Sequence, residues 1–133
     1  MKVIPVPATE LDRWLPDIEW HLEQFAANGS ATPDDYIDDI RDRKSQCWLA
    51  YDGRVRCVVL TELTTDRLET CRVTHAAGDG YKEWLHLFPI IKQWATENGC
   101  KRLVAVARPG WEKMLKRYGL RKTHVVLEVD LDG

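Results

Sequence analysis

A short turn between a strand-like segment and a helical segment holds the residues best suited to chemistry in this chain. The stretch "VTHAAGDGYKEW", residues 73–84, ends an alternating run at His75 and then places Asp79 between Gly78 and Gly80, before an amphipathic helix. Backbone N–H groups at such a strand–turn–helix junction, together with the helix dipole, can bind a phosphate. The same residues also suit a plain tight bend, because an aspartate is a good helix N-cap without any ligand.

His75 is the titratable side chain nearest to this turn. A histidine changes its charge near neutral pH, so it could accept a proton from a reacting group or donate a hydrogen bond to a phosphate. The alternative interpretation is a half-buried histidine at the end of a strand, bonded to backbone. The sequence leaves both readings open.

The cysteines and histidines show no spacing typical of metal ligands. Cys47, Cys57, Cys71 and Cys100 are widely separated, form no C-x-x-C pair and lie in apolar or strand-like segments. We therefore expect buried free thiols, no disulfide and no metal site.

Length and composition favour one globular domain over residues 1–133. The chain is 44% hydrophobic and 30% charged with a net charge of −2, which argues against disorder and against a dedicated nucleic-acid binder. The N-terminus lacks an apolar leader segment, and no apolar run is long enough to cross a membrane. These features predict a cytoplasmic protein without membrane or nucleic-acid partners.

Hydrophobic periodicity predicts the elements that must position the turn. Three strands form an antiparallel meander, joined by the hairpin signal Asp52-Gly53 and by a turn at 64–67. Thr9 and Thr32 are the expected N-caps of two helices that precede the meander. The remaining expected elements are a strand at 2–6, a long helix at 80–97, a buried strand at 102–107, a helix at 109–119 and a final strand at 120–131. The order predicts an α/β fold with a mixed sheet, a long crossover helix and helices on both faces.

This order, over nearly the whole chain, resembles the GNAT N-acetyltransferase superfamily. In the terminal part, "WEKMLKRYGLRK" (111–122) is similar to the family's last helix and the turn that follows it. The resemblance implies a GNAT-like N-acyltransferase that uses acetyl-CoA as co-substrate in a ternary complex, with a small-molecule or protein amine as acceptor.

The resemblance also implies where the co-substrate binds. It assigns contacts with the pantetheine arm to Val73, Thr74 and His75, and contacts with the pyrophosphate to Gly78, Asp79, Gly80, Tyr81 and Lys82. In the family motif Gln/Arg-x-x-Gly-x-Gly/Ala, His75 stands at the Gln/Arg position, so the spacing is kept and the residue type is not. Arg108 aligns with the asparagine that often precedes the last helix, and Leu115 stands where many members have a tyrosine. The acetyl-CoA motif is therefore degenerate.

Two glutamates complete the implied catalytic set. Glu62 and Glu69 lie in the meander, where the family often places a carboxylate base, although a solvated strand residue is the alternative reading of each. The acidic run at 34–42 could attract a cationic amine or could simply be a solvated helix face. Trp20 falls off the apolar stripe of its helix and could mark a partner-facing patch, although burial is the commoner state of a tryptophan.

A narrower resemblance leads to a different class of function. Compact GNAT-like proteins encoded among the structural genes of tailed bacteriophages resemble this chain in size, in the long tryptophan-bearing helix and in the segment "RPGWEKMLKRYGL" (108–120). This resemblance implies a viral protein of the host cytoplasm or the virion. The alternative function is thus a non-catalytic GNAT-like structural or interaction protein, with virion proteins or a second copy of the chain as partners.

Overall fold

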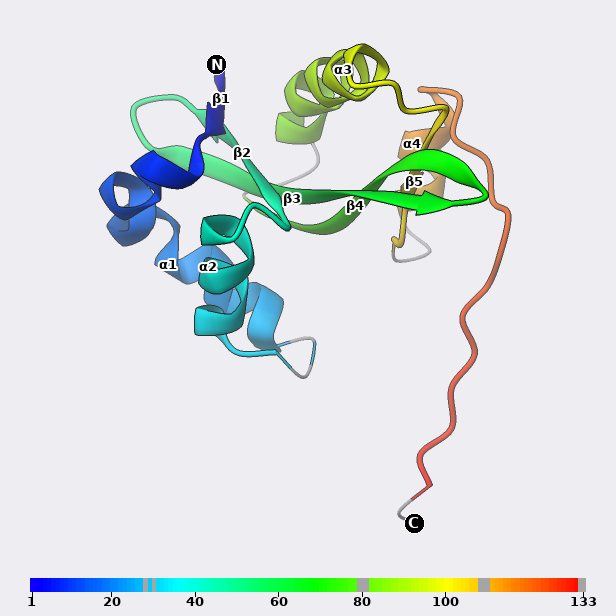
Figure 1. Ribbon diagram of the computed structural model, residues 1–133, viewed down its shortest axis with the longest axis horizontal. Coiled ribbons are helices and arrows are strands. Elements are labelled where there is room, and N and C mark those ends of the chain that lie inside the picture. The colour runs from blue at the N-terminus through cyan, green and yellow to red at the C-terminus, as the bar shows by residue number, and fades with distance from the viewer. Residues whose placement is uncertain (28, 30, 79–81, 108–110, 132–133) are drawn as a thin grey trace.

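The computed structural model describes residues 1–27, 29, 31–78, 82–107 and 111–131. In chain order its elements are β1 (Lys2–Val6), a 3-10 turn (Ala8–Glu10), α1 (Leu11–Ala27), α2 (Pro33–Arg41), β2 (Gln46–Tyr51), β3 (Val55–Asp66), β4 (Leu68–Gly78), α3 (Lys82–Glu97), β5 (Arg102–Ala105) and α4 (Glu112–Lys116). Figure 1 shows α1 and α2 on one side of a twisted sheet and α3 on the other.

The strands form one mixed sheet in the order β1-β2-β3-β4-β5. The first four strands pair antiparallel, and β5 joins β4 in parallel after the crossover through α3. This arrangement confirms the predicted α/β class, the antiparallel meander and the helices on both faces.

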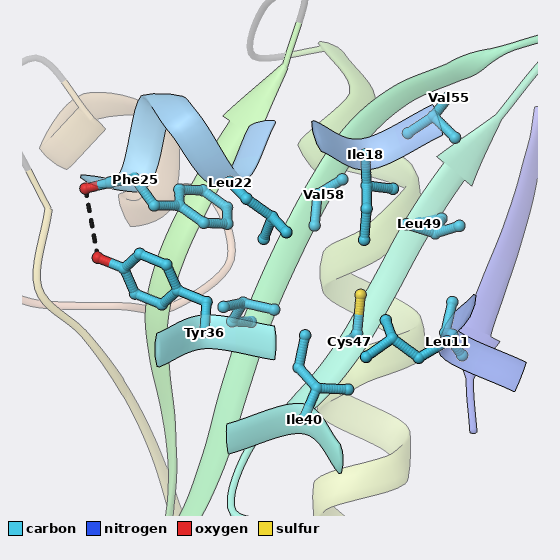
Figure 2. Packing of buried hydrophobic residues seen from close by; sticks show 12 residues of the cluster. Leu11, Ile18, Leu22, Phe25, Tyr36, Ile40, Cys47, Leu49, Val55 and Val58 are labelled. Carbon is cyan, nitrogen blue, oxygen red and sulfur yellow. Dashed lines mark hydrogen bonds between the residues drawn. The ribbon is translucent and has the colours of Figure 1, made fainter. Parts of the chain in front are cut away.

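The apolar core lies in two layers because both faces of the central strands are covered. Cys47 and Leu49 of β2 belong to the cluster beneath α1 and α2, which Figure 2 shows from close by, whereas Trp48 and Ala50 point into the cluster beneath α3 and α4. Alternation between two buried faces explains why β2 reads as a continuous apolar run.

Local signals set the ends of several elements. Thr32 caps α2 in a reciprocal capping box: its hydroxyl accepts from the Asp35 N–H at 3.3 Å, and its own N–H donates to the Asp35 carboxylate at 2.8 Å. Gly53 adopts φ +71° in the β2–β3 hairpin, as the Asp-Gly signal predicts. Thr9 is not an N-cap; it lies inside the 3-10 turn that precedes α1.

The predicted final strand is wrong. Residues 120–131 form neither helix nor strand, and residues 121–131 are exposed. The chain leaves the domain here as an extended segment that ends far from the sheet (Figure 1). A strand needs a neighbouring backbone to pair with, and alternation in the sequence cannot supply one. Within the described residues, no helix combines the length and the apolar character needed to cross a membrane.

Candidate active site

The edge of β4 that faces β5 is only partly paired. The parallel register runs from Thr70↔Arg102 to Val73↔Ala105 and ends there, while β4 continues to Gly78 with β3 on its other side. In the described part of the chain, residues 74–78 therefore have no strand on this edge. Their outward backbone N–H and C=O groups are available to an extended ligand, as at any open sheet edge.

A β-bulge lies where this open edge begins. Thr61 pairs with Val73 and Leu60 pairs with His75, so Thr74 is an extra residue in β4. The Thr74 hydroxyl donates to the Leu60 carbonyl oxygen at 3.2 Å. Bulges bend a strand and redirect its groups, which helps β4 to diverge from β5.

The divergence of the two strands opens a cavity of about 790 Å³. β4 contributes its whole C-terminal half to the wall, Val73 to Gly78. The other lining residues come from the end of α1, the end of β5, the start of α4 and the C-terminal segment: Trp20, Gln24, Phe25, Gly29, Ala105, Val106, Ala107, Trp111, Leu115 and Glu128. A cavity of this size is large enough for a drug-sized ligand.

Of the predicted site residues, the cavity brings together Val73, Thr74, His75 and Gly78. Asp79, Gly80, Tyr81 and Arg108 lie outside the described residues, and Lys82 is the first described residue of α3. The strand and the helix that flank the predicted turn are thus in place. The pyrophosphate contacts stay a prediction.

His75 is held in an aromatic pocket at the wall of the cavity. Its ring centroid lies 5.1 Å from that of Phe25 and 4.8 Å from that of Tyr36, and the Tyr36 hydroxyl donates to the Phe25 carbonyl oxygen (Figure 2). Its buried Nδ1 has no hydrogen-bond partner among the described residues. Burial lowers the pKa of His75, and the negative charge of Glu62 offsets part of that shift. The imidazole is therefore neutral at neutral pH and able to accept a proton.

The two glutamates occupy different places. Glu62 is half-buried, faces Arg72 across the β3–β4 ladder at 3.4 Å and acts on His75 through its charge. Glu69 is exposed near the far end of β4, where its carboxylate accepts from the Thr65 hydroxyl at 3.0 Å. Neither is among the described residues that line the cavity. The structure thus groups Glu62 loosely with His75 and leaves Glu69 apart.

The close packing of β4 against β3 is enough to require a glycine at position 78, without any ligand. A Cβ atom at this position would lie 2.5 Å from the Arg56 carbonyl oxygen and 2.8 Å from the Cys57 Cβ. These distances are shorter than van der Waals contact, so β3 and β4 can approach this closely only with glycine here.

Cys47 and Cys71 are poor candidates for a nucleophile. All four are free thiols, as predicted, and three of them are buried. Burial raises the pKa of Cys47 and of Cys71 to about 12 each. A thiol with such a pKa is almost never a thiolate near neutral pH, so neither of these two cysteines is suited to carry a covalent acyl group.

Sequence reasoning missed the part of the wall that α1 and the C-terminal segment provide. Trp20 is 53% exposed, its ring meets that of His21 edge-on at 5.0 Å, and it lines the cavity. Its off-stripe position was the signal in the sequence. Glu128 gave no such signal, because it lies in a segment predicted as a strand.

Solved structures with the same architecture cover nearly the whole chain. An aminoglycoside acetyltransferase from an uncultured soil metagenomic sample, in complex with sisomicin, matches at 11% identity and TM-score 0.71 over 98% of this chain and 95% of that one. The fold is that of the GNAT acetyltransferases. A predicted acetyltransferase from Clostridium acetobutylicum, solved with acetyl-CoA, matches at 10% identity and TM-score 0.70 over 97% and 95%. A ribosomal-protein-alanine N-acetyltransferase from Brucella melitensis biovar Abortus 2308 matches at 17% identity and TM-score 0.65 over 97% and 100%.

No family model matches the sequence, and no curated protein matches it significantly. At identities of 10–17% the likeness extends to the GNAT fold and does not assign an activity to this chain.

Proposed function

We propose that this protein is an N-acyltransferase that binds acetyl-CoA along the open edge of β4 and transfers the acetyl group directly to an amine. The observation that carries the proposal is the edge of residues 74–78, which pairs with no strand among the described residues and lies beside a cavity of about 790 Å³. The GNAT fold supports it, because the solved neighbours include an acetyltransferase with acetyl-CoA.

The described residues fit an extended thioester ligand. The free backbone groups of β4 alternate donor and acceptor, as the amides of a pantetheine chain do, so the arm would add to the sheet like another strand. Lys82 opens α3 a few residues after Gly78, which places a helix N-terminus after the strand end. A helix N-terminus favours the binding of an anion even where no basic side chain contacts that anion.

In this proposal residues of β4 supply both the base and the donors to the oxyanion. Acetyl-CoA supplies a thioester whose C–S bond breaks as the acceptor nitrogen forms a C–N bond. Neutral His75, at the cavity wall, takes the proton that the nitrogen loses. Backbone N–H groups at the Thr74 bulge are candidates for donating to the oxygen that becomes negative. The departing thiolate takes up a proton from solvent.

Of the three catalytic residues predicted from the sequence, we propose only His75 as the base, because only it lines the cavity. Glu62 is better placed to tune the pKa of His75, and Glu69 is the least favoured.

The amine acceptor would enter on the side of the cavity that α1 forms. Trp20 presents an exposed indole there, and Glu128 adds a carboxylate across the cavity wall. An aromatic face and a negative charge both attract cations. A suitable panel of acceptors therefore contains an aminoglycoside, a peptide that begins with alanine and simple alkyl amines.

The test is a thiol-release assay with acetyl-CoA and this panel, in the wild type and in two matched variants. We expect His75→Gln to lower kcat by about 10²–10⁴-fold, the range of a general base. Glu69→Gln, which removes a carboxylate outside the cavity, should leave kcat within about twofold of wild type. A His75→Gln enzyme with wild-type kcat would remove this residue from the mechanism.

A non-catalytic GNAT-like module is the second candidate. It is favoured by two observations: the rings of Phe25 and Tyr36 hold His75 as a packing residue, and close approach of β3 requires Gly78 without any ligand. Absence of thiol release with every amine, together with no binding of coenzyme A, would favour this module. The fold does not bear on a bacteriophage origin, which stays a prediction.

A further inference from the structure

A second cavity, of about 350 Å³, lies where β1 ends and β2 begins, and is called the β1–β2 cavity below. Its walls come from the end of β1, the end of α2, the start of β2 and Trp94 of α3. Among the described residues, none lines both this cavity and the one beside β4. It is therefore a separate site, and its volume lies at the lower end of the range for small-molecule pockets.

Two tryptophans give the β1–β2 cavity an aromatic wall that is fixed in position. Trp48 is 3% exposed, and its indole N–H donates to the Thr61 hydroxyl at 3.0 Å. That hydroxyl in turn donates to the Gln46 side-chain carbonyl oxygen at 2.9 Å. The ring of Trp94 lies edge-on to that of Trp48, with 5.2 Å between the centroids. Because the Trp48 N–H already has a partner, this wall offers mainly an apolar aromatic surface.

The wall formed by the end of β1 is apolar and rigid. Pro5 and Pro7 flank Val6, and all three residues line the cavity. A proline has no backbone N–H and a fixed φ, so this segment cannot pair fully with an added strand. The wall therefore suits a small apolar molecule better than an extended peptide.

Arg43 is the one charged residue among the described residues that line this cavity, and its side chain is exposed. Its backbone has φ +61°, because α2 ends in a Schellman motif: the Lys44 N–H donates to the Asp39 carbonyl oxygen at 2.9 Å, and the Arg43 N–H to that of Ile40 at 3.1 Å. Glycine is the usual residue at this position, since a side chain is strained there. The end of the helix therefore does not explain an arginine.

We propose that the β1–β2 cavity binds a small aromatic carboxylate, with the ring against Trp48 and Trp94 and the carboxylate on Arg43. A guanidinium binds a carboxylate through two parallel hydrogen bonds, and the exposed side chain of Arg43 is placed at the rim to make them. Ser45, which also lines the cavity, adds a hydroxyl donor on the same side. The aspartates of α2 are not among the described lining residues. This binding does not depend on acyl transfer.

The test uses three compounds that share one indole ring and differ in charge: indole-3-acetate, indole-3-acetamide and tryptamine. Each is titrated into the ¹⁵N-labelled full-length protein, and the amide and indole N–H resonances of the cavity residues are followed. We expect saturable shifts at Gln46 and Trp48 with indole-3-acetate, with a Kd on the order of 1 mM or tighter. The neutral and the cationic compounds should bind at least about tenfold more weakly.

Two matched variants separate binding from folding. Arg43→Gly removes the guanidinium and the strained side chain together, so Tm should be at least that of the wild type, whereas the affinity for indole-3-acetate should fall at least about tenfold. Arg67→Gly is the control, because Arg67 also has a positive φ, +67°, and is not among the residues that line the cavity. Its Tm should likewise not fall, and its affinity should equal that of the wild type.

Three results would overturn the proposal. Equal affinity for the three compounds would exclude recognition of a carboxylate. Wild-type affinity in Arg43→Gly, or the same loss in Arg67→Gly, would exclude the contact with Arg43. Resonances of the cavity residues that do not shift with any of the compounds at about 10 mM would exclude the site itself.

Discussion

Replacing Gly78 by alanine tests how closely β3 and β4 approach at the base of the cavity. The new Cβ would lie 2.5 Å from the Arg56 carbonyl oxygen and 2.9 Å from the Cys57 Cα, whereas ordinary contact begins near 3.4 Å. Two of the three nearest atoms belong to the backbone of β3, so the strands have to separate. Overpacking of this kind costs about 1–3 kcal/mol of the free energy of unfolding.

The corresponding shift in melting temperature follows from the size of the chain. With an unfolding entropy of about 2.1 cal/mol/K per residue, 133 residues give about 0.28 kcal/mol/K, so Tm should fall by about 4–11 °C. Calorimetry and urea unfolding followed by tryptophan fluorescence measure both quantities.

The control for this prediction is Ala76→Ser, an exposed position two residues earlier in β4, which should change the free energy of unfolding by less than about 0.5 kcal/mol. If Gly78→Ala unfolds at the wild-type temperature, β3 and β4 are further apart than the structure has them. In that case the packing explanation of this glycine is wrong, and close approach of a ligand becomes the better one.

Two further predictions concern buried polar groups near the site. Burial lowers the pKa of His75 in the folded state, so the stability contributed by neutral His75 is fully present above pH about 6.5 and is lost as the pH falls through the lowered pKa. The free energies of unfolding of the wild type and of His75→Gln, measured between pH 7.5 and 5, should therefore diverge as the pH falls. Glu62→Gln should lower the pKa of His75 further, as measured by NMR titration. Thr61→Val should lower the free energy of unfolding in urea by about 1–3 kcal/mol, because the fully buried Thr61 hydroxyl accepts from the Trp48 indole N–H at 3.0 Å. Thr65→Val, at an exposed position, is the control and should lower it little. Equal effects of the two substitutions would contradict the buried hydrogen bond.

The features that sequence reasoning predicted correctly are those with local causes. The capping box at Thr32 and the hairpin at Gly53 follow from a few neighbouring residues. The apolar run of β2 identifies a strand covered on both faces, because periodicity records burial. Element order then limited the fold to few topologies.

The features that it could not predict depend on segments far apart in the chain. The bulge at Thr74 exists only in the register between β3 and β4. The open edge of β4 exists because β5 stops pairing at Ala105. Likewise, the aromatic pocket of His75 joins α1, α2 and β4, and no spacing in the sequence marks it. Residues 120–131 show the reverse case: their pattern is that of a strand, and among the residues that the structure describes they pair with no other strand.

The central claim is that the open edge of β4 binds the pantetheine arm of acetyl-CoA. Titration of the ¹⁵N-labelled protein with acetyl-CoA, followed by amide resonances, measures this directly. We predict saturable shifts concentrated in residues 74–78, with coenzyme A giving nearly the same pattern. Amides of β4 that do not move at saturating acetyl-CoA, or shifts confined to another face of the domain, would contradict the account.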